Sequence, residues 1–175
     1  MLEAKKVEAV EMVISAETAG TDGQYLHEAI RLAVENVQEG LGGPFGAVIV
    51  RKGAVLARAG NRVTTANDPT AHAEVQAIRA ACSKLATFQL DGCTLYASCE
   101  PCPMCFGAIY WARLDSVVFA ARSEDAARYG FDDSHIYHEV RQEAGERLRA
   151  FHHVEHDESL APFLAWEQQS GRIDY

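Results

Sequence analysis

The sequence predicts an α/β fold built on one mixed sheet. Stretches with an apolar residue every three or four positions, typical of amphipathic helices, alternate with short apolar runs typical of buried strands. Their order is helix, two strands, helix, strand, helix and strand. This order describes a single sheet covered by helices on both faces.

The first predicted elements are a helix and a hairpin. Apolar residues recur with helical spacing over residues 24–39, and the glycines that begin at Gly40 end this helix. Two apolar runs, 46–50 and 54–59, are separated by Lys52–Gly53, and this spacing predicts a β-hairpin.

The rest of the chain alternates between helices and strands. Residues 94–121 form a strand-helix-strand unit, for which we expect a right-handed parallel crossover. The pattern over 139–156 is ambiguous and fits a helix followed by a last strand at 150–154. The other expected elements are a loop at 60–70, a helix at 71–85, strands at 94–97 and 116–121, and helices at 103–113, 123–129 and 160–169.

Length and composition fit a single domain. A chain of 175 residues suits one domain with a sizeable core and is short for two. We therefore expect one domain over 21–175 with a tail at 171–175, preceded by an extension of unclear structure at 1–20. No apolar run approaches the ~20 residues that cross a bilayer, and the acidic start does not fit a signal peptide. A cytoplasmic protein without membrane association is the expectation.

The charge of the chain disfavours a nucleic-acid partner. The formal net charge is −9, and residues 123–175 alone carry −7. Binding to a phosphate backbone depends on clustered lysine and arginine. Residues 41–122 sum to +3, so this central block can still accept an anionic or electron-rich small molecule.

A candidate zinc site lies at the starts of two predicted helices. His72 and Glu74 begin one helix, and Cys102 and Cys105, three residues apart, begin the next, with Pro103 in its first turn. One nitrogen and two sulfur ligands leave zinc an open fourth position for water, as catalytic sites do. Helix N-termini favour the thiolate form of both cysteines. Glu74 is placed to carry the proton of that water.

Two other readings of these cysteines are less consistent with the sequence. A closed structural zinc site has no use for a glutamate at position 74. A redox Cys-x-x-Cys motif needs no distant His-x-Glu. The histidines at 152, 153 and 156 suggest a second metal site, but we interpret them as solvated side chains on a strand edge. The fourth ligand of a closed zinc site would be Cys82, Cys93 or Cys99.

The pattern His-x-Glu followed by Pro-Cys-x-x-Cys resembles the signature of zinc deaminases. Longer stretches resemble the bacterial guanine deaminases of the cytidine deaminase superfamily, from about Gly42 to Tyr175. The middle stretches are shared across that superfamily, whereas Phe131-Asp132-Asp133 and the C-terminal tyrosine are more discriminating. The similar stretches are Gly43–Ala47, Asn67–Glu74, Ser98–Cys105, Gly107–Arg113 and Gly130–Ser134.

The resemblance implies a three-layer α/β/α sandwich and a homodimer whose subunits exchange their C-terminal segments over each other's pockets. It implies one zinc ion per chain, bound by His72, Cys102 and Cys105. It also implies that Glu74 and Asp133 are the two catalytic carboxylates. The expected substrate-binding residues are Phe45 and Phe131 against the purine, Asn61 on its polar edge, Trp111 in the pocket wall and Tyr175 over the partner's site.

The reaction implied is hydrolysis of guanine to xanthine and ammonia. Water activated by zinc attacks C2, Glu74 carries its proton to N3, and Glu74 or Asp133 assists the departure of ammonia. Guanosine, cytosine and ammeline remain alternative substrates, because one or two pocket contacts decide among them. A transfer-RNA adenosine deaminase is a further alternative, although it should carry a basic surface. A catalytically silent zinc scaffold is the alternative of another class.

Overall fold

The computed structural model describes residues 21–174. The expectations for residues 1–20 and for Tyr175 lie outside the described residues. The chain divides after Asp133 into two units, and each is described by itself.

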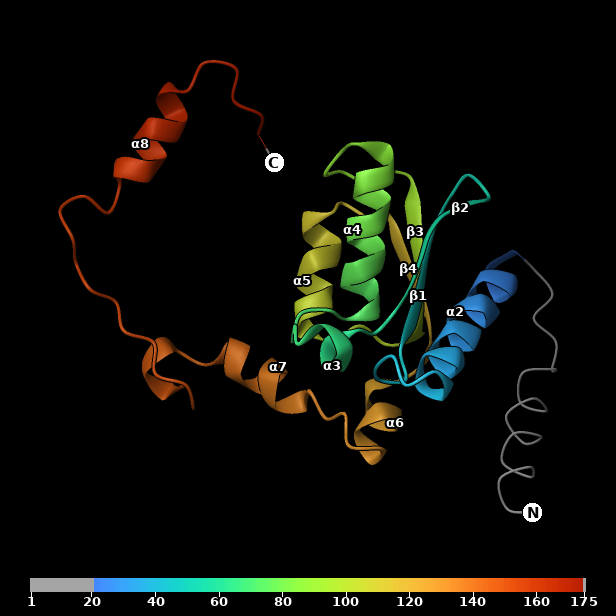
Figure 1. The fold of residues 1–175 in the computed structure, drawn as a ribbon. Coiled ribbons are helices and arrows are strands. Elements are labelled where there is room, and N and C mark those ends of the chain that lie inside the picture. The colour runs from blue at the N-terminus through green and yellow to red at the C-terminus, as the bar shows by residue number, and fades with distance from the viewer. Residues whose placement is uncertain (1–20, 175) are drawn as a thin grey trace, which may run out of the picture. The chain divides into compact units, whose positions relative to one another are not determined.

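The first unit contains a mixed four-stranded sheet (Figure 1). Its strands are β1 (Gly46–Arg51), β2 (Ala54–Gly60), β3 (Cys93–Cys99) and β4 (Ser116–Ala121), in the spatial order β2-β1-β3-β4. β1 pairs antiparallel with β2 and β3, whereas β3 and β4 run parallel. The predicted mixed sheet and the parallel pairing across residues 94–121 are therefore confirmed.

The predicted hairpin is confirmed, together with its turn. Only Lys52 and Gly53 separate β1 from β2, with φ angles of 49° and 78°. A two-residue turn with both φ angles positive has the twist that matches paired strands. Glycine adopts this conformation without strain, which explains its place at the second position.

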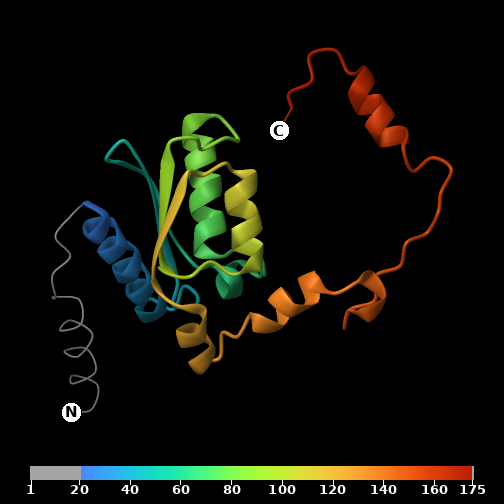
Figure 2. The ribbon, with the colours of Figure 1, turned by 180° about the vertical axis from the view of Figure 1, so that it is seen from behind.

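Helices cover both faces of the sheet, as Figures 1 and 2 show from opposite sides. On one face lies α2 (Thr21–Gln38), and on the other lie α4 (Ala73–Leu85) and α5 (Pro103–Trp111). Side chains alternate along β1 because successive residues of a strand point to opposite faces. Ala47 and Ile49 join the core cluster under α4, and the valines between and after them join the cluster under α2. The three-layer sandwich is thus confirmed.

Two short helices flank the sheet strands. α6 (Ser123–Arg128) follows β4 where a helix was predicted. α3 (Val63–Ala66) lies in the segment predicted to be only loop. Its four residues lack a helical apolar pattern, and tertiary contacts hold it instead: the Thr65 hydroxyl donates to the Leu41 carbonyl at 2.7 Å, and Asn67 ends it with φ 50°.

The second unit is made of α7 (Ser134–Arg141), a 3₁₀ turn (Ala144–Glu146) and α8 (Ala161–Gln168). The final helix is confirmed, but the strand predicted at 150–154 is wrong. Phe151 and Val154 are exposed in irregular backbone, and no strand of the described chain pairs with this segment. Apolar residues alone do not make a strand, because a strand is stabilised by pairing with a neighbouring strand. None of the helices within 21–174 has the length and apolar character needed to cross a membrane.

Candidate metal centre and active site

His72, Cys102 and Cys105 converge as a metal site. Both cysteine Sγ atoms lie 3.5 Å from Nδ1 of His72, and all three ligand atoms lie within 4.8 Å of one another. Zinc in a tetrahedron, with bonds of about 2.3 Å to sulfur and about 2.0–2.1 Å to nitrogen, separates such atoms by about 3.6 Å. The donor set and its spacing therefore fit zinc.

Local structure explains how residues thirty positions apart meet. His72 is the N-cap of α4 and Cys102 is the N-cap of α5, with Pro103 in the first turn of α5. The two helices lie side by side on one face of the sheet (Figure 1). Cys105 lies one turn into α5, so its sulfur faces the same side as that of Cys102. Both helix N-termini place positive dipole ends at the thiolates.

The sulfurs are electrostatically coupled. A hydrogen bond between the two cysteines is the largest cause that lowers the pKa of Cys102 to about 4 and raises the pKa of Cys105 far above its ordinary value. The thiol of Cys105 therefore holds its proton more tightly than the thiol of Cys102. The hydrogen bond between the imidazole of His72 and the sulfur of Cys102 is the main cause that raises the pKa of His72. Metal binding displaces such protons, so zinc affinity should increase with pH.

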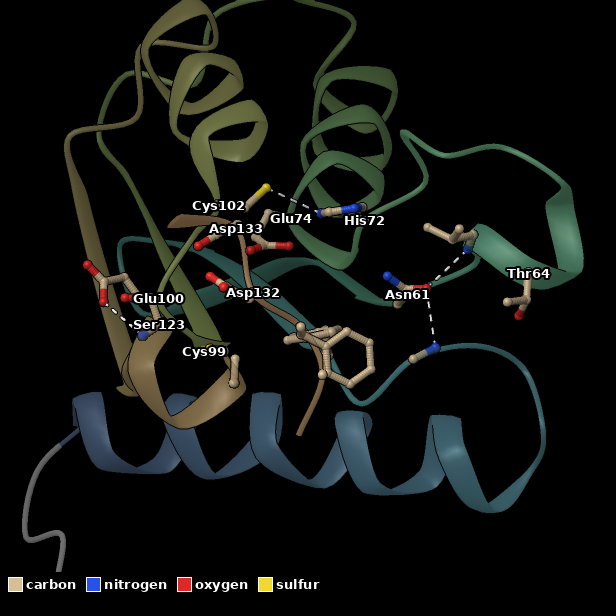
Figure 3. Close-up of a pocket in the computed structure, with 16 residues that line it drawn as sticks. Asn61, Thr64, His72, Glu74, Cys99, Glu100, Cys102, Ser123, Asp132 and Asp133 are labelled. Carbon is tan, nitrogen blue, oxygen red and sulfur yellow. Dashed lines mark hydrogen bonds between the residues drawn. The ribbon is translucent and has the colours of Figure 1, made fainter. Parts of the chain in front are cut away.

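Glu74 is the buried carboxylate of the site. Only 7% of the residue is exposed, and burial raises the pKa of its carboxyl group. Figure 3 shows its carboxylate between His72 and Asp133, facing the cavity. A carboxyl group whose pKa is moved toward neutrality is suited to accept and return a proton.

These groups open into a cavity of about 350 Å³, which lies in the size range of small-molecule sites. Phe45 and Phe131 form one wall, with ring centroids 5.0 Å apart in an edge-to-face arrangement. The structure brings together Phe45, Asn61, His72, Glu74, Cys102, Phe131 and Asp133 as lining residues, and Cys105 lies behind them as a metal ligand.

Asn61 presents an amide NH₂ group to the cavity. Its Oδ1 accepts hydrogen bonds from the backbone N–H groups of Val63 at 3.1 Å and Gly43 at 3.3 Å. These two donors fix the orientation of the amide, and Figure 3 shows its nitrogen on the cavity side. The site therefore offers a hydrogen-bond donor at this position.

Asp133 lies in the cavity wall, and burial is the main cause that raises the pKa of its carboxyl group. Two further acids, Glu100 and Asp132, line the same cavity and were not predicted as site residues. Glu100 Oε2 accepts a hydrogen bond from Ser123 N at the start of α6. Glu100 could have been found from its place between strand β3 and the cysteine pair.

Trp111 lies away from this cavity. It ends α5, 70% of the residue is exposed, and it is not among the residues that line the cavity within one chain. Tyr175 lies outside the described residues.

A closed four-ligand zinc site does not form in the described residues. The metal-binding group within 21–174 consists of three side chains, and the histidines at 152, 153 and 156 are not part of it. Cys99 reaches the cavity wall, but its thiol donates to the Arg122 carbonyl, and burial raises its pKa to about 11. Within the described residues, three side chains supply the metal ligands, the number typical of a catalytic zinc site.

Comparison with known proteins agrees with this geometry. Residues 20–121 match the family model described as the cytidine and deoxycytidylate deaminase zinc-binding region. The chain is 56% identical to the guanine deaminase of Bacillus subtilis over 151 residues, covering 86% of this chain and 97% of that protein. The crystal structure of this relative superposes with a TM-score of 0.86, covering 87% of this chain and 97% of its own.

Two further relatives mark the range of the similarity. The structure of a guanine deaminase from Nitrosomonas europaea superposes with a TM-score of 0.61 at 37% identity, covering 67% of this chain and 68% of its own. A transfer-RNA-specific adenosine deaminase from Aquifex aeolicus is 47% identical over 78 residues, which cover only 45% of this chain and 52% of that protein. The chain belongs to the zinc-dependent cytidine and deoxycytidylate deaminase family, in which it matches a guanine deaminase over most of its length.

Proposed function

We propose that this protein is a zinc-dependent guanine deaminase that converts guanine to xanthine and ammonia. The observation that carries the proposal is the buried Glu74 beside a three-ligand zinc site, at the end of a cavity with an aromatic wall. The similarity to a guanine deaminase, which covers 86% of this chain and 97% of that protein, supports the choice of substrate.

The residues of the site divide the work of hydrolysis. His72, Cys102 and Cys105 would hold the zinc ion, which would supply a Lewis acid to activate water near neutral pH. Glu74 accepts a proton from the attacking water and delivers it to N3 of the ring. Its raised pKa allows it to hold the proton between the two transfers. Glu74 or Asp133, which also lines the cavity, assists the departure of ammonia.

The base is held by its faces and by one polar edge. Phe45 and Phe131 provide apolar surface against the purine. Aromatic contacts of this kind discriminate only weakly among ring systems of similar size. The Nδ2 group of Asn61 donates to an acceptor on the polar edge of guanine. Its Oδ1 is already occupied by two backbone donors, so Asn61 recognises an acceptor and not a donor.

The charge of the cavity favours a free base over a nucleotide or RNA. Four carboxylates line it, and no lysine or arginine is among its lining residues. Phosphate groups bind through positively charged side chains, and the carboxylates that line the cavity repel them. This argues against a transfer-RNA substrate despite the similarity to RNA deaminases over part of the chain. It also favours guanine over guanosine phosphates.

We also propose that the protein is a homodimer that exchanges its C-terminal segments. The described residues of the second unit include exposed Phe151, Phe163 and Leu164 and contain no buried side chain. Apolar surface of this extent in a short segment is typical of a protein interface. A second copy of the same chain is the simplest partner, because exchange of identical elements produces a symmetric dimer.

A cytoplasmic location remains part of the proposal. All five cysteines are free in the structure. Two of them are zinc ligands that must remain reduced, and a reducing compartment keeps them so.

An ammonia-release assay over guanine, guanosine, ammeline, cytosine and transfer RNA tests the proposed function. Guanine should be deaminated fastest, with xanthine as the product, and transfer RNA should remain unchanged. The Glu74→Gln protein, prepared in the same way, controls for contaminating deaminases. Deamination of transfer RNA without deamination of guanine would contradict the proposed substrate but not the zinc chemistry.

A further inference from the structure

Asn36 is a buried polar residue outside the cavity. It lies near the end of α2, and only 3% of it is exposed. Its Nδ2 group donates to the carbonyl of Gly43 at 2.8 Å and to the carbonyl of Asn61 at 2.9 Å. Its Oδ1 accepts a hydrogen bond from the guanidinium group of Arg62. Every hydrogen-bonding group of this amide is therefore used inside the fold.

These contacts close a loop of hydrogen bonds around Asn61. Asn36 holds the carbonyl of Gly43, and the N–H of Gly43 donates to Oδ1 of Asn61. Asn36 also holds the backbone carbonyl of Asn61 itself. The one amide thus joins the loop before β1 to the loop after β2, and between them these loops fix both the backbone and the side chain of Asn61.

Two glycines show how closely the three segments approach. A Cβ on Gly60 would lie 2.4 Å from Oδ1 of Asn36, and a Cβ on Gly42 would lie 2.2 Å from the carbonyl oxygen of Asn61. Neither position has space for a side chain. The glycines at 42 and 60 therefore allow the side chain of Asn36 and the backbone of Asn61 to approach closely.

We propose that Asn36 is a positioning residue that sets the affinity for the base by fixing Asn61 at the cavity wall. Its side-chain hydrogen bonds join it to Gly43, Asn61 and Arg62 and not to a metal ligand or Glu74, so we expect its influence on binding of the base and not on proton transfer. This inference rests on the proposed deamination of a purine base, with Asn61 as the residue that recognises its edge.

A double-mutant cycle tests the inference. Asn61→Ala should raise the KM for guanine by about tenfold or more, through loss of one hydrogen bond to the base. Asn36→Ala should raise KM by roughly five- to tenfold, with kcat within about twofold of wild type and zinc content unchanged. In the Asn61→Ala background, Asn36→Ala should change KM by less than about twofold, because the residue through which it acts is already absent.

Two further variants keep the test decisive. Asn36→Asp preserves the volume but places a carboxylate against two carbonyl oxygens, so it should raise KM even if Asn36→Ala folds poorly. Leu26→Ala, on the same helix and packed against the core cluster under α2, controls for general destabilisation and should leave KM unchanged. Equal increases in KM from Asn36→Ala with and without Asn61 would overturn the inference, as would zinc loss or a purely kcat effect. A wild-type protein that does not deaminate guanine contradicts the proposed function instead, and the cycle then applies to whichever base it converts.

Discussion

Residues 21–133 bury their own apolar side chains, whereas residues 134–174 bury none of theirs. The buried hydrophobic residues run from Ala29 to Ala112 and form two clusters on opposite faces of the sheet. In the second unit Phe163 and Leu148 are more than two-thirds exposed. The first unit has the contents of an independent fold, and the second does not.

This difference indicates that the first unit contains the catalytic site and that the second unit forms the proposed dimer interface. The three metal ligands and the described residues that line the cavity all lie in the first unit. Short helices without a buried face are marginally stable in water. The helices of the second unit therefore need another surface to stabilise them, and we assign that surface to a second copy of the chain.

Loss of a zinc ligand is the substitution with the largest expected effect. Cys105→Ser replaces a thiolate by a hydroxyl, which is a poor zinc ligand. Zinc content, measured by elemental analysis, should fall from one ion per chain to near zero, and deamination should disappear. Full zinc content in this variant would contradict the ligand assignment. Cys82→Ser, which changes a cysteine outside the metal group, should retain both zinc and activity.

Glu74→Gln should have the next largest effect, and it separates binding from chemistry. The amide cannot accept the proton, so kcat should fall by ~10²–10⁴ or more. Zinc content and the unfolding temperature should remain close to those of wild type, because the side chain keeps its shape. Near-normal turnover would show that another residue carries the proton.

Deletion of residues 171–175 tests the proposed role of the C-terminal segment. We expect kcat/KM for guanine to fall by about tenfold or more, because in the proposed dimer the exchanged segment of the partner excludes water from the cavity. Zinc content and thermal unfolding should not change, since the first unit is intact. Tyr175→Ala should reproduce the loss if the ring is the part that matters. Full activity in the truncated protein would leave the tail without a role in the site.

A smaller effect is expected in the pH dependence. Burial raises the pKa of Glu74 above its ordinary value of 4.5, and the carboxylate is the form that accepts a proton. The kcat/KM for guanine should therefore be maintained above the raised pKa and fall as the pH decreases through it, so the acid limb lies above pH 4.5. A limb at or below pH 4.5 would contradict the dominance of burial at this site.

The sequence predicted most of the first unit, because its elements carry strong local signals. The helix over 24–39, the hairpin at Lys52–Gly53 and the zinc ligands all rest on spacing that the fold preserves. The short helix at 63–66 was missed because a hydrogen bond from the Thr65 hydroxyl to the Leu41 carbonyl stabilises it, and no local sequence pattern predicts that bond. Asn36 was missed for the same reason, since its partners are distant backbone carbonyls.

The sequence-based predictions were least accurate for residues whose contacts in the fold do not follow from their local sequence pattern. The segment 150–154 has the apolar residues of a strand, but none of the described strands pairs with it. Trp111 was expected in the cavity wall, and in one chain it lies exposed at the end of α5. Segment 150–154 and Trp111 are both exposed in the described chain. The spacing of apolar residues in the sequence does not predict which surface, if any, packs against them.

Removal and return of zinc tests the central claim most directly. Protein stripped of metal by a chelator should convert no guanine, and stepwise addition of zinc should restore xanthine formation in proportion to the zinc bound. We expect activity to saturate at one zinc ion per chain. Xanthine formation by the metal-free protein, or a zinc-loaded protein that leaves guanine unchanged, would contradict it.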